Sequence, residues 1–270
     1  MVNKIAFIGA GSMAEAIISG MISGNYIQAD KIFVTNRSNQ KRLIELHEQY
    51  QIQYSHDKEK ILDNADVVIL SMKPADVKSA IGPIHNYIKP NQLIISVVAG
   101  IPIAQLSSLI DKNISIIRAM PNTSASIGFS ATAIAKGEQV TEEQINLANS
   151  LFQTIGTTFI IDEKDMHTVT ALSGSGPAYV YYLVEAMEKA AIETGLDHSI
   201  AKSLIAQTIL GAGEMLQQSK KTAGVLRKEI TSPAGTTEAG IKTLEKYDFE
   251  KTVIECVKSA RKRSIELAEE

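Results

Sequence analysis

Residues 4–14 read KIAFIGAGSMA, an apolar run that passes through a glycine-rich turn into a segment rich in helix formers. This pattern predicts a strand, a tight turn and a helix. Gly9, Gly11 and Ala14 have the spacing of a dinucleotide-binding turn, in which two glycines allow the turn and the close approach of a pyrophosphate. Small residues at such a junction also serve packing alone. The position between a strand and a helix favours a cofactor site, with phosphates facing the positive end of the helix.

Strand and helix patterns alternate beyond this turn. Further strands are expected at residues 31–35, 66–70, 92–97, 114–118, 131–135 and 157–161. Helices are expected between them, at residues 40–50, 58–65, 75–87, 103–110 and 142–152. The run DVVIL at 66–70 is typical of a parallel strand buried on both faces. The sequence therefore predicts an α/β fold with an N-terminal Rossmann-type, doubly wound and mainly parallel sheet.

Strand patterns end near residue 162, and the rest of the chain reads as helices. They are expected at residues 177–194, 199–218, 237–247 and 249–268. Many of their positions are apolar or small, more than one small helical domain can bury. We therefore predict a dinucleotide-binding domain at residues 1–163 and a C-terminal all-helical dimerisation and substrate domain at residues 164–270.

The composition limits the classes of partner. The chain has 270 residues, of which 44% are hydrophobic and 21% charged, and its net charge is −3. This balance is ordinary for a globular protein and gives no general attraction to nucleic acid or to an anionic membrane. The single cysteine excludes a disulfide framework, and the 5 histidines lack metal-ligand spacing. Bound metal is therefore not expected. No signal peptide or membrane span is recognisable, so a cytoplasmic protein is expected.

Polar loops follow three successive predicted strands. They are SMKP at residues 71–74, VAGIP at 98–102 and MPNT at 120–123. Ligands of open α/β sheets bind at the carboxyl ends of the strands, so these loops favour a cleft there. Each loop on its own is also an ordinary strand-to-helix turn.

The tripeptide Asn36-Arg37-Ser38 follows the second predicted strand. An acidic residue at this place would hydrogen-bond the ribose 2′-OH of NAD. An arginine with neutral hydrogen-bonding neighbours instead suits the 2′-phosphate of NADP. A solvated loop arginine is the alternative, and the glycine turn favours NADP.

Two stretches of the helical half also suit a ligand. LSGSGPAY at residues 172–179 opens a helix with a proline, and its glycines let the backbone approach a flat ligand. ITSPAGTTE at residues 230–238 is dense in hydroxyl groups and leads into a helix, so it can offer N–H and O–H groups to a carboxylate. An ordinary helix start explains either stretch, with Thr236 or Thr237 as the N-cap of the second.

Motifs for other chemistry are missing from the sequence. It has no G-x-S-x-G elbow, no P-loop and no paired carboxylates at a plausible site. A reaction that needs little acid–base machinery is therefore expected. Hydride transfer from a nicotinamide fits, because the cofactor carries the difficult step.

Over its whole length the chain resembles the pyrroline-5-carboxylate reductases. The residues that carry the resemblance are 9–14, 72–74, 99–101, 118–123, 173–179 and 231–237. The resemblance implies an oxidoreductase that reduces L-1-pyrroline-5-carboxylate to L-proline with NADPH or NADH, the last step of proline biosynthesis. It also implies a homodimer intertwined through the helical domain, with active sites that draw on both chains. Some members of the family assemble further, into decamers.

The resemblance also assigns roles to single positions. For the cofactor it implies contacts from Gly9, Ala10, Gly11, Ser12, Met13, Asn36, Arg37, Ser38, Asp57, Met72, Lys73, Pro74 and Asn122. For the substrate it implies contacts from Ser175, Ser232, Gly235, Thr236 and Thr237. The hydroxyl of Thr237 is expected to hydrogen-bond the ring nitrogen, which makes Thr237 the catalytic residue.

Five positions depart from the residues usual in that family. Ser12 and Asp57 each stand where the family has Asn, Ser124 replaces a proline, Ala234 a glycine and Lys228 an aspartate. Ala234 would alter the carboxylate-binding turn if its φ is positive.

Two other functions stay open at this point. One is a non-catalytic, NADP(H)-binding regulatory relative, which the five departures motivate. The other is a reductase of another small imine or of a hydroxy acid. A hydroxy-acid enzyme would need a lysine early in the first long helix of the C-terminal half, and Lys189 lies well beyond that point.

Overall fold

The computed structural model describes residues 2–269, and the chain divides into two compact units. The first unit runs to Ser175 and includes the chain from Ser259 onward, whereas the second is Gly176–Lys258. The predicted domain boundary after residue 163 stays a prediction.

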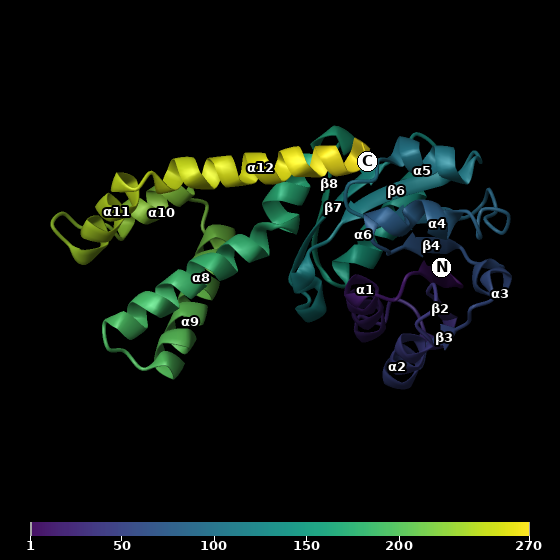
Figure 1. The fold of residues 1–270 in the computed structure, drawn as a ribbon, viewed down its shortest axis with the longest axis horizontal. Helices are drawn as coiled ribbons and strands as arrows, with labels where there is room; N and C mark the ends of the chain where they lie inside the picture. The colour runs from purple at the N-terminus through teal and green to yellow at the C-terminus, as the bar shows by residue number, and fades with distance from the viewer. Residues whose placement is uncertain (1, 270) are drawn as a thin grey trace. The chain divides into compact units, whose positions relative to one another are not determined.

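The first unit is built on one sheet of eight strands (Figure 1). The strands are β1 Ile5–Ile8, β2 Ile32–Thr35, β3 Gln53–Tyr54, β4 Val67–Leu70, β5 Leu93–Ser96, β6 Ser115–Met120, β7 Ser130–Lys136 and β8 Gly156–Ile160. Their order is β3-β2-β1-β4-β5-β6-β7-β8, and every pair is parallel except β6 with β7. The predicted doubly wound, mainly parallel sheet is therefore confirmed.

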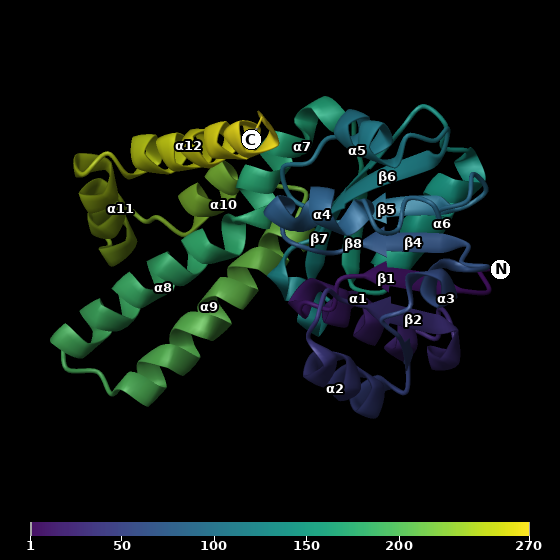
Figure 2. The ribbon, with the colours of Figure 1, turned by 45° about the vertical axis from the view of Figure 1, so that its right-hand side comes forward.

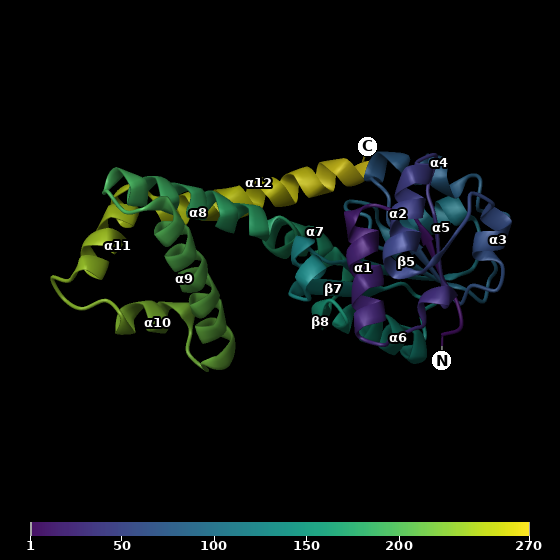
Figure 3. The ribbon, with the colours of Figure 1, turned by 90° about the horizontal axis from the view of Figure 1, so that it is seen from below.

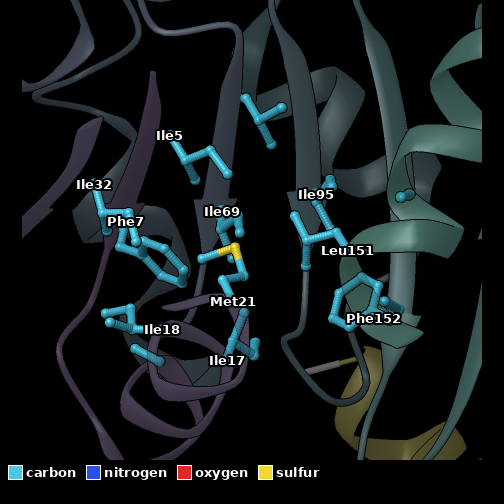
Figure 4. Packing of buried hydrophobic residues seen from close by; sticks show 14 of the residues in the cluster. Ile5, Phe7, Ile17, Ile18, Met21, Ile32, Ile69, Ile95, Leu151 and Phe152 are labelled. Atoms are coloured by element: carbon cyan, nitrogen blue, oxygen red, sulfur yellow. The ribbon is translucent and has the colours of Figure 1, made fainter. Parts of the chain in front are cut away.

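Helices cover both faces of this sheet (Figure 2). They are α1 Ser12–Ser23, α2 Gln40–Tyr50, α3 Lys58–Leu62, α4 Val77–Ile81, α5 Ile103–Ile110, α6 Glu142–Gln153 and α7 Met166–Val169. Successive strand residues point to opposite faces, so Ile5 and Phe7 pack with α1, α2 and α6, whereas Ala6 and Ile8 pack with α3, α4 and α5. Figure 4 shows the first of these two cores, where Ile17 and Met21 of α1 lie among the strand side chains.

Several boundaries differ from the sequence prediction. The helix expected at residues 75–87 is a 3₁₀ turn, Pro74–Asp76, followed by the short α4, because Gly82 and Pro83 end it. The helix expected at 58–65 ends at Leu62. The edge strand β3 was not predicted, since it has two half-buried residues and no apolar run. The short helices α7 and α10 (Ala223–Glu229) were not predicted either.

The second unit is made of helices, as predicted. Along the chain come α8 Gly176–Glu193, α9 His198–Gln218, α10 Ala223–Glu229, α11 Thr236–Lys246 and α12 Phe249–Glu269, and the last turns of α12 group with the first unit. The helices α8 and α9 lie side by side (Figure 1), and α10 and α11 follow α9 in succession (Figure 3). In the part of the chain that the structure describes, no helix combines the length and apolar character that a membrane crossing requires.

Large apolar side chains of this unit are exposed in the single chain. On α8, Tyr181 is 60% exposed and Tyr182 is 75% exposed. Within the part of the chain that the structure describes, α8 has no buried residue. Leu204 and Leu210 of α9 and Val253 of α12 are exposed as well. Apolar surface of this extent is characteristic of a protein–protein interface.

Candidate active site

The direction of the strand order reverses between β1 and β4, and the glycine turn lies at this point. Ser71, which follows β4, donates its N–H to the carbonyl of Ile8 at 2.9 Å and its hydroxyl to the carbonyl of Gly9 at 3.2 Å. Gly9 has φ +118°, and a Cβ at this position would lie 2.2 Å from the Ser71 carbonyl oxygen. Only glycine fits there. The turn therefore stands at the topological switch point, where doubly wound sheets bind ligands.

A cleft of about 730 Å³ opens beside this turn. Gly11, the N-cap of α1, has no side-chain cap, and nothing lies within 4 Å of the place where its Cβ would be. The first intrahelical bond of α1 runs from Glu15 to the Gly11 carbonyl, so the preceding N–H groups have no acceptor within the helix. This end of α1 can accept a phosphate, and the open side of Gly11 leaves room for one to come close.

Most of the predicted cofactor residues line this cleft. They are Gly9, Ala10, Gly11, Ser12, Met13, Asn36, Arg37, Met72 and Lys73. Ser38, Asp57, Pro74 and Asn122 are not among the lining residues. Asp57 caps α3 instead, since its Oδ1 accepts the N–H groups of Glu59 at 3.0 Å and Lys60 at 3.2 Å.

The amide of Asn122 connects two of the predicted motifs. Its Nδ2 donates to the carbonyl of Ser173 at 3.0 Å, while its Oδ1 accepts the N–H of Ser124 at 3.1 Å. The carboxyl end of β6 is thereby joined to the segment that leads into α8. Ser175 ends this segment and donates its N–H to Thr170 at 2.9 Å. Both ends of the Asn122 amide are therefore hydrogen-bonded, and the amide holds the segment that contains Ser175 against the end of β6.

The end of β2 offers groups suited to an adenosine. Asn36 Oδ1 is a buried acceptor without a partner among the described residues, although its Nδ2 donates to the Asn39 carbonyl at 2.7 Å. Arg37 has an 85% exposed side chain, and its Nη1 lies 3.9 Å from Asp76 Oδ1. An orphaned acceptor and a loosely held guanidinium fit a ligand that carries both hydroxyl and phosphate groups.

Two charged side chains that the sequence analysis did not single out also belong to this region. Lys58 lines the cleft, and its Nζ donates to Thr35 Oγ1 at 2.8 Å and to the Asn36 carbonyl at 3.2 Å. Burial lowers the pKa of Lys58 below its ordinary value. Arg42 of α2 donates its Nε to the carbonyl of Ala10 at 3.0 Å and forms an ion pair with Glu15. No local pattern marks either residue, because the partners are distant in sequence.

We expect Arg42→Gln to weaken the binding of NADPH and NADH to the same extent. The substitution frees the Ala10 carbonyl and leaves the Glu15 carboxylate unneutralised in the first turn of α1, close to where a pyrophosphate would bind. Since the ion pair is partly exposed, the effect should be about 1 kcal/mol, or roughly fivefold in each Kd. Fluorescence titration with both cofactors measures it. Unchanged Kd values would show that Arg42 only joins α2 to α1.

The hydroxyl-rich turn of the second unit leads into α11. Gly235 is the N-cap of α11 and makes no side-chain cap bond, so the alternative in which Thr236 or Thr237 is the N-cap is wrong. Both threonines lie in the first helical turn, and within residues 2–269 neither hydroxyl has a hydrogen-bond partner. Glu238 reaches back to accept the N–H of Ala234 at 2.9 Å. The turn therefore presents free hydroxyls at the positive end of a helix.

Ala234 adopts a backbone conformation that normally favours glycine. Its φ is +58°, in the left-handed region, where an L-residue with a Cβ carries a cost of about 1 kcal/mol. The turn still closes, because Gly235 donates its N–H to the Ser232 carbonyl at 3.1 Å. The replacement of glycine by alanine at this position thus leaves the turn formed.

Arg118, in the middle of β6, is a structural residue. Its side chain is buried and lies 3.4 Å from Glu163, whose Oε1 also accepts the N–H of Ile103 at 2.7 Å. Burial lowers the pKa of Arg118, and the Glu163 carboxylate acts against this shift. The pair joins the segment after β8 to the sheet.

Among the described residues, no group of three His, Cys, Asp or Glu could hold a metal ion.

Comparison with known proteins identifies the family. Residues 163–267 match the family model described as pyrroline-5-carboxylate reductase dimerisation, and residues 4–100 match the model described as NADP oxidoreductase, coenzyme F420-dependent. Pyrroline-5-carboxylate reductase 2 of Bacillus subtilis is 46% identical over 268 residues, which cover 99% of this chain and 96% of that protein. The chain belongs to the pyrroline-5-carboxylate reductase family.

Solved structures of pyrroline-5-carboxylate reductases share the fold over almost the whole chain. The Coxiella burnetii enzyme superposes with a TM-score of 0.91 at 35% identity and covers 99% of both chains. The Plasmodium falciparum enzyme, solved with NADP bound, superposes with a TM-score of 0.88 at 30% identity and covers 98% of both chains. The resemblance inferred from the sequence is therefore confirmed, as is the combination of a Rossmann-type sheet with a helical dimerisation domain.

Proposed function

We propose that this chain reduces L-1-pyrroline-5-carboxylate to L-proline with NADPH, the last step of proline biosynthesis. The observation that carries the proposal is the pair of free threonine hydroxyls in the first turn of α11, preceded by the Ser232–Gly235 turn. Together with a dinucleotide cleft and membership of the family, it supports a reductase of a small carboxylated imine. A regulatory protein that only binds NADP(H) would not need this second site.

In the first unit, Gly9 to Met13 would hold the pyrophosphate and Asn36 and Arg37 the adenosine end. Met72 and Lys73 would line the same cofactor. We also propose cofactor contacts for the four predicted residues that do not line the cleft, Ser38, Asp57, Pro74 and Asn122. When bound, NADPH supplies the hydride. Residues 1–163 thus serve the cofactor, and residues 164–270 serve the substrate and the dimer.

In the second unit, Ser232, Gly235 and Thr236 would bind the substrate carboxylate through N–H and O–H groups. Ser175, the last residue of the first unit before α8, would also contact the substrate. The hydroxyl oxygen of Thr237 would accept the N–H of the protonated imine. Its own pKa is far too high to make it a proton source, so the proton comes from solvent or arrives with the substrate. Holding the two reactants in contact contributes several kcal/mol to catalysis.

The proposal includes a homodimer. The apolar side chains exposed on α8, α9 and α12 support it, and so does the match to a dimerisation domain. Dimers could assemble further, as in the decameric members of the family. The proposed location is the cytoplasm, where reduced nicotinamide cofactors are regenerated.

The proposed reaction is tested by following NADPH oxidation by the purified protein with L-1-pyrroline-5-carboxylate and identifying L-proline as the product. We expect NADPH consumption to match L-proline formation. NADPH binding without turnover would favour the regulatory alternative. Faster turnover of the six-membered cyclic imine, or of a hydroxy acid with NADP⁺, would assign the other reductase function.

We expect the enzyme to prefer NADPH over NADH, and Arg37→Asp to reverse this preference. The residues after β2 include no carboxylate to receive the ribose 2′-OH, and the guanidinium of Arg37 lines the cleft. An aspartate would repel the 2′-phosphate and accept a hydrogen bond from the hydroxyl of NADH. The ratio of kcat/KM values for the two cofactors, in parent and variant, measures the change. A parent that prefers NADH would contradict the assignment.

A further inference from the structure

Lys58 lies at the start of α3, yet its side chain reaches the carboxyl end of β2. The ammonium donates to Thr35 Oγ1 at 2.8 Å and to the Asn36 carbonyl at 3.2 Å. The same side chain lines the cleft that holds the glycine turn, Asn36 and Arg37. An ammonium has three N–H donors, so one donor is left for a ligand.

The positive charge of Lys58 has no negative partner within the described part of the chain. Arg37 has Asp76 at 3.9 Å and Arg42 is paired with Glu15, but no carboxylate lies within 4.0 Å of the Lys58 ammonium. Removal of a charge from water without a counter-ion is costly, and burial lowers the pKa of Lys58 accordingly. A partly buried cation of this kind suits a site whose counter-ion arrives with the ligand.

We infer that Lys58 is a specificity-determining residue that binds the 2′-phosphate of NADPH together with Arg37. The two side chains differ in how they are held. Lys58 is fixed by its bonds to Thr35 and Asn36, whereas the side chain of Arg37 is 85% exposed. A fixed ammonium and an exposed guanidinium can together neutralise a phosphate dianion, and the fixed cation loses little side-chain freedom on binding.

The inference rests on one part of the proposed function, the binding of NADP(H). It does not depend on which substrate is reduced. The alternative is that Lys58 only stabilises the turn after β2. A structural role of this kind would affect NADPH and NADH alike, because both cofactors carry the same adenine, ribose and pyrophosphate. A phosphate contact affects only ligands that carry the 2′-phosphate.

The test compares ligands with and without the 2′-phosphate in full-length Lys58→Gln. Titrations use NADPH and NADH, and also adenosine 2′,5′-bisphosphate and adenosine 5′-monophosphate. We expect Kd to rise roughly 10- to 100-fold for NADPH and the bisphosphate, as for the loss of a hydrogen bond between charged groups, and less than about twofold for NADH and the monophosphate. Lys58→Arg should retain most of the selectivity.

Lys60→Gln is the matched control, since it removes the same charge from the same helix at an exposed position outside the cleft. It should leave all four Kd values within about twofold of the parent. Equal weakening of NADPH and NADH in a folded Lys58→Gln protein would overturn the inference, and so would unchanged NADPH binding. This test measures cofactor binding, whereas the proposed reaction is tested by turnover. If the proposed reaction were wrong, the protein would still bind NADPH more tightly than NADH but would not turn over the substrate.

Discussion

Thr237→Ala is expected to lower kcat/KM for L-1-pyrroline-5-carboxylate by roughly 10- to 150-fold, because it removes one hydrogen bond to a charged ring nitrogen worth about 1.5–3 kcal/mol. The Kd of NADPH should stay unchanged. The glycine turn and the cleft belong to the first compact unit, whereas Thr237 belongs to the second. Steady-state kinetics and a cofactor titration on the same preparation measure the two effects.

The folded state of this variant should be as stable as that of the parent. Gly235 is the N-cap of α11 without a side-chain bond, and the Thr237 hydroxyl has no partner among the described residues, so its removal breaks no capping interaction. Alanine also has the higher helix propensity. Thr237→Ser is the matched control, since it keeps the hydroxyl, and it should keep most of the activity. A folded Thr237→Ala protein with parental kcat/KM would remove Thr237 from the active site.

The glycine turn and the sheet could be predicted because their signals are local. Buried parallel strands are continuous apolar runs, such as VVIL in β4, and the glycine spacing follows the first of them directly. The edge strand β3 was missed because it has two half-buried residues and no such run. The helix expected at residues 75–87 was predicted too long, because α4 ends after five residues at a glycine and a proline inside an otherwise helical pattern.

The cofactor cleft was only partly predictable. Carboxyl ends of parallel strands meet at one edge of a sheet, so the turn at Gly9 and the loop at Met72 could be placed together from sequence. Lys58 and Arg42 could not, because their partners Thr35 and Ala10 are 23 and 32 residues away and depend on how α2 and α3 pack.

The turn before α11 shows a different limit. Its hydroxyl-rich composition indicated an anion site, but which residue caps the helix depends on backbone angles that composition does not reveal. Gly235 has φ −84° and ψ +170°, as an N-cap requires, which places both threonines inside the helix. Likewise Asp57 matches a cofactor position of the family, and its carboxylate is used to cap α3.

Gly9→Ala and Gly11→Ala should separate the two functions of the glycine turn. In Gly9→Ala the new Cβ would meet the Ser71 carbonyl oxygen at 2.2 Å and its carbon at 2.6 Å, on a backbone with φ +118°. Overpacking and left-handed strain together should cost about 2–4 kcal/mol of unfolding free energy, or roughly 4–16 °C in Tm. Cofactor binding should weaken as well, since β1 and β4 must move apart at the cleft.

Gly11→Ala should weaken NADPH binding with little loss of stability. Gly11 has φ −78° and ψ −177°, which alanine adopts without strain, and its Cβ would meet nothing within 4 Å. Stability should therefore stay within about 1 kcal/mol of the parent, the range for an N-cap change. The added methyl group occupies space that the pyrophosphate needs, so Kd should rise about tenfold or more. Calorimetry and fluorescence titration of both variants provide the comparison. A Gly11→Ala protein with parental NADPH affinity would show that the pyrophosphate does not approach the backbone at Gly11.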